Sequence, residues 1–459
     1  MKMTVLGPIV ALVIGGAAGF IAGKNTAPEP EEKDATTTDI RSIRRSGGGS
    51  GSTSGGGSAR SVRVKSASEA LALPGQNSRL QALMDYYANL DPSQFEEEAA
   101  KLEDLPWSER IMVGYLLFSR WGEEDPTEAL AYTKTMGFAG MFVSGTVMQS
   151  WASKDPQGAA QYYQDNPGEF RMSGMMGGRG RGGGASTAGV IATEWARQDS
   201  AGALTWAQSL EGRDQRDAIR NVFSESAKSD PSEAAAMLGT VTDPEAKKEA
   251  QNSVAREWGK QNWEDAQTWI ASLPADDQAG ASSQALRGLA ETDPEKAAGN
   301  ISMVPEGEAR DDVMESIARQ WGRDDPAAAA SWVMANGSEN AQKESIERVM
   351  PSWVQQDSAA AMAFINEQPE GGLRDSAASS YVFSNQGGDI QQNLSLAETI
   401  GDDRTRSRTI GMTVGGWMRQ DKEAATNYLE TTESISQESK DRIQNWSSGG
   451  RGRGRGRGR

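Results

Sequence analysis

The amino-acid sequence predicts an all-α protein whose main part is an α-solenoid of about 10–11 helix-turn-helix repeats. Three observations support this fold class. A tryptophan, an Asp-Pro pair, an alanine and a second aromatic residue recur in that order along the chain. Their period is 31–32 residues, as in solenoids built from small helical units. Apolar residues within one copy lie three or four apart, as on one face of a helix.

Composition divides the 459 residues into four segments. We expect a transmembrane signal anchor at 1–23, a disordered Gly/Ser-rich linker at 24–76, the repeat domain at 77–446 and a disordered Arg-Gly tail at 447–459. The net charge of −17 is uneven, because the repeat domain carries 33 Lys or Arg and 58 Asp or Glu, a net −25. Such an acidic body repels polyanions, so nucleic acid is a disfavoured partner.

The N-terminal segment is predicted to cross a membrane. Residues 4–23 contain no charge and, as a helix, would span about 30 Å, the thickness of a hydrocarbon core. Lys2 precedes this run and a mostly acidic stretch follows Lys24. We therefore expect a single-pass protein of a bacterial cytoplasmic membrane, with its N-terminus inside and its body in the periplasm or outside. The alternative is a signal peptide cleaved near residues 17–19, which would release a secreted protein.

Three glycines of this segment, Gly15, Gly19 and Gly23, lie four apart and thus on one helix face. Small residues at this spacing let two membrane helices approach closely, so they are a candidate homodimer contact. The alternative is that they only reflect how common glycine is in membrane helices. The linker that follows contains GGGSGSTSGGGS at 47–58, which is flexible coil by composition.

Eleven anchor residues define the repeat, each counted as position 0. The full copies have Asp at +4, often Pro at +5, Ala at +8 and an aromatic residue at +11, with Asn262 in place of Asp in one copy. The copies at Tyr87, Ser226 and Leu289 are weaker, and the copy at Phe383 is degenerate. Neighbouring anchors are 30–34 residues apart, except for one interval of 44 that contains a Gly/Arg/Met-rich insert at 171–186. Ten of the 13 tryptophans fall at position 0 or +11, so the repeat is not a product of chance. The anchors are Tyr87, Trp121, Trp151, Trp195, Ser226, Trp258, Leu289, Trp321, Trp353, Phe383 and Trp417.

Each repeat is predicted to hold two helices, with the second beginning at the Asp of position +4. An Asp side chain accepts hydrogen bonds from free amides of the first turn, and proline suits the first helical position. A glutamate three residues later predicts a capping box at Asp125 and at Asp230. We interpret these acids as caps and not as catalytic groups. The predicted helix N-caps are Asp91, Asp125, Asp155, Asp199, Asp230, Asp293, Asp325, Asp357 and Asp421.

The tryptophans are predicted to form the core between the helices. The alanine at +8 is small enough to let neighbouring helices approach, and the aromatic residue at +11 lies on the same helix face. The alternative is a ladder of rings on which a ligand stacks. The predicted core consists of Trp121, Trp151, Trp195, Trp206, Trp258, Trp269, Trp321, Trp332, Trp353 and Trp417.

The unit resembles the helical-hairpin repeats of the tetratricopeptide and related α-solenoid families over residues 77–446. The resemblance consists of an aromatic residue late in the first helix, Asp-Pro at the turn, and Ala followed by an aromatic residue in the second. The period is shorter than the 34 residues of a tetratricopeptide unit, and its W-x2-L-G-x2-Y motif is absent. The resemblance implies binding of a protein or peptide on the solenoid surface.

The sequence offers little for catalysis. It contains no Cys and no His, which excludes disulfides, zinc sites built on these ligands and Ser-His-Asp arrangements. A Gly-x-Gly-x-x-Gly match at 178–183 lies in a low-complexity stretch with no strand before it, so we discount it. The acid pairs lack the spacing of a calcium loop. We therefore expect no enzyme activity, no cofactor and no bound metal.

The Arg-Gly tail is a separate candidate site. Arg451, Arg453, Arg455, Arg457 and Arg459 alternate with glycine and are a candidate contact for a polyanion, either an envelope polymer or RNA. Contact with the acidic body itself is a further alternative. The sequence thus leaves two main hypotheses. The first is a membrane-tethered scaffold or adaptor that binds a protein partner in the cell envelope, and the second is a polyanion-binding protein that acts through the tail.

Overall fold

The computed structural model describes residues 64–137, 139–170 and 186–448. Contacts divide the chain into two compact units, Met1–Met176 (unit 1) and Gly177–Arg459 (unit 2). The predicted membrane segment with Gly15, Gly19 and Gly23 lies outside the described residues, as do 171–185 of the insert and the arginines of the tail. All regular structure in the described ranges is helical, which confirms the all-α fold class.

Unit 1 contains three pairs of helices among its described residues. Its helices are α2 (Ala67–Leu71), α3 (Gln76–Ala88), η1 (Pro92–Gln94), α4 (Phe95–Ala100), η2 (Lys101–Asp104), α5 (Trp107–Glu124), α6 (Pro126–Thr135), α7 (Gly140–Lys154) and α8 (Pro156–Asp165). The first helices of the pairs are α3, α5 and α7, and they pack in that order. The second position of each pair is taken by η1 with α4, by α6 and by α8.

Unit 2 contains eight pairs and a closing helix in its described residues. These are α10 (Thr187–Ala196), α11 (Ser200–Ser209), α12 (Gly212–Ser229), α13 (Pro231–Met237), η3 (Leu238–Thr240), α14 (Pro244–Gln261), α15 (Trp263–Ser272), α16 (Ala275–Leu289), α17 (Pro294–Gly299), η4 (Ile301–Met303), α18 (Glu308–Trp321), α19 (Pro326–Asn336), α20 (Glu339–Glu367), α21 (Gly372–Ser384), α22 (Ile390–Glu398), α23 (Asp403–Trp417), α24 (Lys422–Thr431) and α25 (Gln437–Ser448). The helix α20 contains one whole pair, because its backbone leaves the helical conformation at Asp357.

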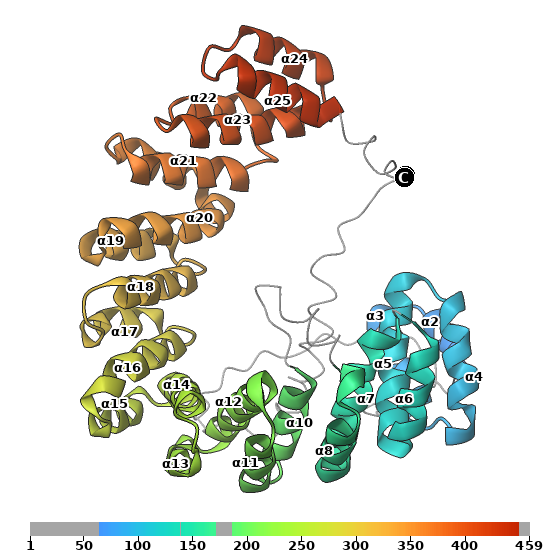
Figure 1. Ribbon diagram of the computed structural model, residues 1–459. Coiled ribbons are helices and arrows are strands. Elements are labelled where there is room, and N and C mark those ends of the chain that lie inside the picture. Colours follow the sequence, from blue (N-terminus) through green and yellow to red (C-terminus); the bar gives the residue numbers. More distant parts are fainter. Residues whose placement is uncertain (1–63, 138, 171–185, 449–459) are drawn as a thin grey trace, which may run out of the picture. The chain divides into compact units, whose positions relative to one another are not determined.

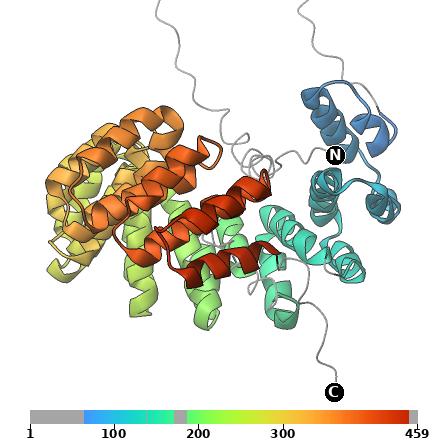
Figure 2. The same ribbon diagram turned by 90° about the horizontal axis from the view of Figure 1, so that it is seen from above.

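The helices of unit 2 form two layers. Consecutive first helices pack on each other, from α10 and α12 through to α23 and α25. In Figure 1 the second helices, such as α13, α15 and α19, lie on the outer side of the row, and α14, α16 and α20 lie on the inner side. Figure 2 shows the same helices from above, coloured along the sequence as in Figure 1. The helical repeats inferred from the 31–32-residue period are therefore present in this unit.

Two predicted boundaries differ from the structure. The linker was expected to reach residue 76, but α2 begins at Ala67 and α3 at Gln76. The early start has a local cause, since the Ser66 hydroxyl caps α2 by accepting from the Glu69 amide and Ala67 and Ala70 are buried. At the other end α25 extends to Ser448, two residues into the predicted tail.

One residue joins the two helices of most pairs. At this hinge, which is the +4 position, φ lies between −136° and −153° and ψ between 80° and 100° in nine copies. Its side chain accepts a hydrogen bond from the amide three residues later, at 2.9 Å for Asp325 and Ala328. Asn262 forms the same contact in the Trp258 copy, where Asn stands in place of Asp. Every residue predicted as an N-cap accepts a hydrogen bond from an amide in the first turn of the helix that follows it: Asp91, Asp125, Asp155, Asp199, Asp230, Asp293, Asp325, Asp357 and Asp421.

The hinge residue ends one helix while it starts the next. The Asp325 amide donates to the carbonyl of Trp321 at 2.9 Å, and the Asp325 carbonyl accepts from the amide of Ala329 at 3.1 Å. The same two bonds recur at eight hinges, so backbone groups left over at both helix ends are satisfied by one residue. Asp91 differs, because it has φ −67° and starts a short 3-10 helix.

The alanine at +8 lies directly against this hinge. Its side chain is 0% exposed in nine copies, from Ala129 to Ala425. A larger residue there would have to displace packed atoms, and protein interiors have few voids. The alanine is therefore required by the packing of the pair.

Substitution of this alanine should destabilise the fold. We expect Ala329→Leu to lower the free energy of unfolding by about 1–3 kcal/mol, because it overpacks a closed site. Ala327→Leu, at an exposed position of the same helix, should change it by less than about 0.5 kcal/mol. Urea unfolding followed by far-UV circular dichroism measures both. Equal effects of the two substitutions would show that the +8 position is not tightly packed.

Candidate binding surfaces

The aromatic residues at positions 0 and +11 form a ring pair in seven repeats. Their ring centroids lie 5.1–6.3 Å apart, as expected for offset or edge-on aromatic contacts. Trp121, Trp195, Trp206 and Trp353 are buried, in line with a core role. The other predicted core tryptophans are only half-buried, namely Trp151, Trp258, Trp269, Trp321, Trp332 and Trp417. Each of these six keeps part of its ring surface open to solvent.

The predicted capping boxes are incomplete. A capping box needs the glutamate to bind the amide of the capping residue, but the Asp125 amide already donates to the Trp121 carbonyl. The Glu128 carboxylate instead accepts from the indole Nε1 of Trp121 at 3.3 Å. Likewise, the Asp230 amide donates to Ser226. Because the amide of the hinge residue is bonded to the preceding helix, it is not available to donate to the glutamate of a capping box.

Sequence reasoning missed a second recurring polar feature, which lies 11 residues before the anchor. A long side chain in the first turn of the first helix donates to backbone carbonyls of the loop before it. These contacts hold the first helix of a repeat against the loop that connects it to the preceding repeat. The signal was present in the sequence as Arg or Gln at Arg110, Gln215, Gln278, Arg310, Gln342 and Arg406.

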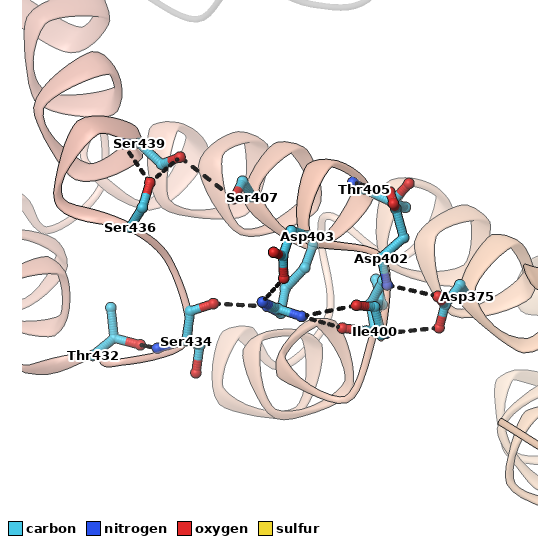
Figure 3. Close-up of polar contacts among 12 residues, drawn as sticks. Asp375, Ile400, Asp402, Asp403, Thr405, Ser407, Thr432, Ser434, Ser436 and Ser439 are labelled. Carbon is cyan, nitrogen blue, oxygen red and sulfur yellow. Dashed lines mark hydrogen bonds and ion pairs between the residues drawn. The ribbon is translucent and has the colours of Figure 1, made fainter. Parts of the chain in front are cut away.

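Around Arg406 these contacts form a network between three repeats (Figure 3). Its guanidinium donates to the carbonyls of Ile400 at 2.8 Å and Ser434 at 2.7 Å, and it pairs with Asp403. The buried Asp375 accepts from the amides of Gly401 and Asp402 at 2.9 and 2.8 Å. All of these acceptors and donors lie in loops or helix starts, so the network holds the repeats together and offers no free reactive group.

Ion pairs also link neighbouring first helices. Glu291, just after α16, accepts from Arg256 at 2.5 Å and from Lys260 at 2.9 Å, both on α14. The two helices touch closely because Gly288 has no side chain, and a Cβ there would collide with the Arg256 carbonyl. Burial raises the pKa of Glu291, but the hydrogen bonds from Arg256 and Lys260 outweigh it and leave the pKa below its ordinary value. The carboxylate is therefore ionised in the folded protein at neutral pH.

Unit 1 exposes several large apolar side chains on its first helices, and we call this set the unit 1 apolar face. It consists of Leu80 and Met84 on α3, Trp107 and Ile111 on α5, and Phe142 on α7. In the described chain these are five of the six exposed large hydrophobic side chains, and Trp107 is 64% exposed. Because α5 packs on both α3 and α7, the five lie on neighbouring helices.

Unit 2 contains an open cleft beside one of the half-buried ring pairs, which we call the Trp321–Trp332 cleft. Its volume is about 530 Å³. The preceding repeat has Leu289 and Asn300 at positions 0 and +11, and α17 ends after six residues. No aromatic pair of that repeat covers the two rings. Other lining residues include Glu295, Gly299, Ile301, Ser302 and Asn336.

Neither a metal site nor a membrane-spanning helix is found among the described residues. Among these residues no three Asp or Glu side chains converge as a metal site would require. No helix in the described ranges is both long and apolar enough to span a bilayer. Residues 4–23 lie outside those ranges, so their membrane role stays a prediction.

Comparisons with known proteins add one distant structural similarity. No family model and no curated protein matches the sequence. Among solved structures, the chain is similar to one described as "Structural Basis of Tubulin Recruitment and Assembly by Microtubule Polymerases with Tumor Overexpressed Gene (TOG) Domain Arrays". The alignment covers 83% of this chain and 99% of that chain, with 10% sequence identity and a TM-score of 0.21. At this score the two chains do not superimpose as one arrangement, and the repeat architecture rests on the geometry above.

The pKa of Glu291 predicts acid sensitivity. A carboxylate whose pKa is lowered by folding stabilises the folded state above the unfolded pKa, and this contribution is lost as the pH falls through the folded pKa. Urea midpoints between about pH 7 and pH 3 should therefore fall less steeply in Glu291→Gln than in the unmodified protein. Glu347→Gln, which makes the same substitution at an exposed position of α20, is the control. An unchanged slope in Glu291→Gln would contradict the assignment.

Proposed function

We propose that this protein is a helical-repeat scaffold that binds a protein partner through the unit 1 apolar face. The observation that carries the proposal is the concentration of exposed large hydrophobic side chains on α3, α5 and α7. Contiguous exposed apolar surface is uncommon on soluble proteins and marks interaction sites. Tryptophan, which is enriched at the energetic centres of interfaces, lies among these side chains and is the most exposed of them.

A structural role, and not a catalytic one, accounts for the acidic residues at the hinges and for Glu291. The Asp residues at the hinges accept backbone amides, and Glu291 is held by two cations. These carboxylates stabilise the helices and their stacking. We accordingly propose no enzyme activity for the chain.

The membrane tether is the second part of the proposal. The uncharged run 4–23 and the lysines on both sides support an anchor with the repeat domain outside a bacterial cytoplasmic membrane. About 40 residues of mostly polar chain separate this run from Val64, the first described residue. This stretch would tie unit 1 to the proposed anchor. The polyanion-binding alternative rests on Arg451–Arg459, outside the described residues, and stays a prediction.

The partner site can be tested with a photo-crosslinking amino acid placed at Trp107. We expect a specific protein adduct in cells, because position 107 would lie at the interface. The same amino acid at Ala131, an exposed position on α6, is the control and should give none. Trp107→Ser with Ile111→Asn should remove adducts formed from position 84, while the unfolding midpoint stays close to that of the unmodified chain. Matching adducts from positions 107 and 131 would contradict the proposal.

The tether can be tested in intact spheroplasts. A protease added outside should digest the repeat domain, and an undigested sample should remain with the membranes after a high-salt wash. Release by the wash would indicate a cleaved signal peptide and a secreted protein. Protection from the protease would place the repeat domain in the cytoplasm and overturn the topology.

A further inference from the structure

The Trp321–Trp332 cleft combines two chemical features that select its ligand. Two indole rings with centroids 6.2 Å apart line it, and both are half-buried. The Glu295 side chain lies at the same cleft and forms no ion pair with any residue that the structure describes, whereas the adjacent Lys296 pairs with Glu264 at 2.7 Å. The cleft therefore offers aromatic faces together with one uncompensated negative charge.

This combination suits an arginine side chain. A guanidinium is attracted to the face of an aromatic ring, most strongly to tryptophan, and it stacks on the ring as a plane. Its hydrogen-bond donors can reach a carboxylate at the same time. The repeat domain carries a net −25, so a cationic peptide approaches it with favourable electrostatics and an anionic one does not.

The chain itself contains such a peptide, which is the Arg-Gly tail. Its five arginines alternate with glycine from Arg451 to Arg459, and glycine lets a backbone lie close to a surface. No aromatic residue interrupts this run, so its recognition elements are the guanidinium groups alone. Charge complementarity with the acidic repeat domain therefore favours this tail as the occupant of the cleft.

The tail is better placed to reach the cleft of another copy than its own. Four helix-to-helix steps separate α18 from α25, which is about 32–40 Å along the row of helices at 8–10 Å per packed pair. The 11 residues after Ser448 span at most about 36–40 Å when fully extended. Contact within one copy would thus require a nearly straight tail, with a large loss of conformational entropy. A second copy imposes no such restraint.

We propose that the Trp321–Trp332 cleft binds an arginine of the tail 449–459 of a second copy, so that copies associate head to tail. An interface between two different surfaces of one chain leaves a free cleft at one end and a free tail at the other. The contact is cationic on one side and acidic on the other, so salt weakens it. This self-association is separate from the partner site proposed for unit 1.

Binding is tested with a synthetic Arg-Gly peptide of the tail sequence and a chain that lacks 449–459. Gly299→Phe fills the cleft, and it should fold because a side chain at Gly299 meets no atom within 4 Å. We expect it to weaken peptide binding about tenfold or more, because it removes ring stacking and burial together. Glu295→Gln should weaken binding roughly two- to fivefold. Gly239→Phe, which also enters open space but lies outside the cleft, is the matched control.

Calorimetry of these variants with an equally charged Lys-Gly peptide distinguishes the cleft from general attraction. The Lys-Gly peptide should bind several-fold more weakly, since an ammonium does not stack as a plane. Equal affinity for the two peptides, with no effect of Gly299→Phe, would overturn the proposal and leave only non-specific charge attraction.

A mixing experiment separates contact between copies from contact within one. The chain lacking 449–459 keeps only a cleft, and full-length Gly299→Phe keeps only a tail. Both keep residues 1–63, so any association through that segment is common to all samples. Light scattering should show a new one-to-one complex in the mixture that is absent from either protein alone and lost in high salt. No complex on mixing, with peptide binding intact, would show that the tail binds its own copy and would refute the proposed association.

Discussion

The repeat depends on one constraint, which is that a single residue must end one helix and start the next. Asp325 satisfies the Trp321 carbonyl with its amide, the Ala329 amide with its carbonyl and the Ala328 amide with its carboxylate. Three hydrogen bonds at one residue leave little freedom, and φ and ψ accordingly fall in the same narrow ranges in nine copies. The angle between the two helices of a pair is therefore similar in each of these repeats.

The buried alanine and the ring pair follow from that fixed angle. The second helix begins against the end of the first, so only a methyl group fits at +8, and the side chain at +11 meets the ring at position 0. Where these residues change, the packing changes locally. Leu289 and Asn300 leave the next ring pair uncovered and open a cleft, which shows how a departure from the pattern creates a surface without disturbing the hinge at Asp293.

The sequence predicted the hinges and the pairs because both depend on residues close in the chain. Asp at +4 and Ala at +8 act within one turn of helix, and their spacing is visible without any tertiary knowledge. The exposure of Trp321 and Trp332 was not predictable in this way, because it depends on which side chains the preceding repeat contributes. The predicted capping box at Asp125 does not form for a related reason, because the Asp125 amide that Glu128 would bind already donates to the Trp121 carbonyl of the preceding helix. The recurring Arg or Gln before the anchor was visible in the sequence, but its role depends on a loop fold that spacing does not reveal.

A chain of such repeats can hold separate binding surfaces with little interference between them. Each pair packs mainly on its neighbours. A change of residue in one repeat therefore affects the stability of that repeat and its neighbours, and not the packing of distant repeats. The unit 1 apolar face and the Trp321–Trp332 cleft lie on repeats far apart in the sequence and differ in chemistry, since the first is apolar and the second combines two indole rings with Glu295. The partner proposed for the first surface would therefore not compete with the arginine proposed for the second. Within each unit the repeated hinge sets how the two helices of a pair meet, and the repeat that breaks the pattern leaves open the cleft proposed as a binding site.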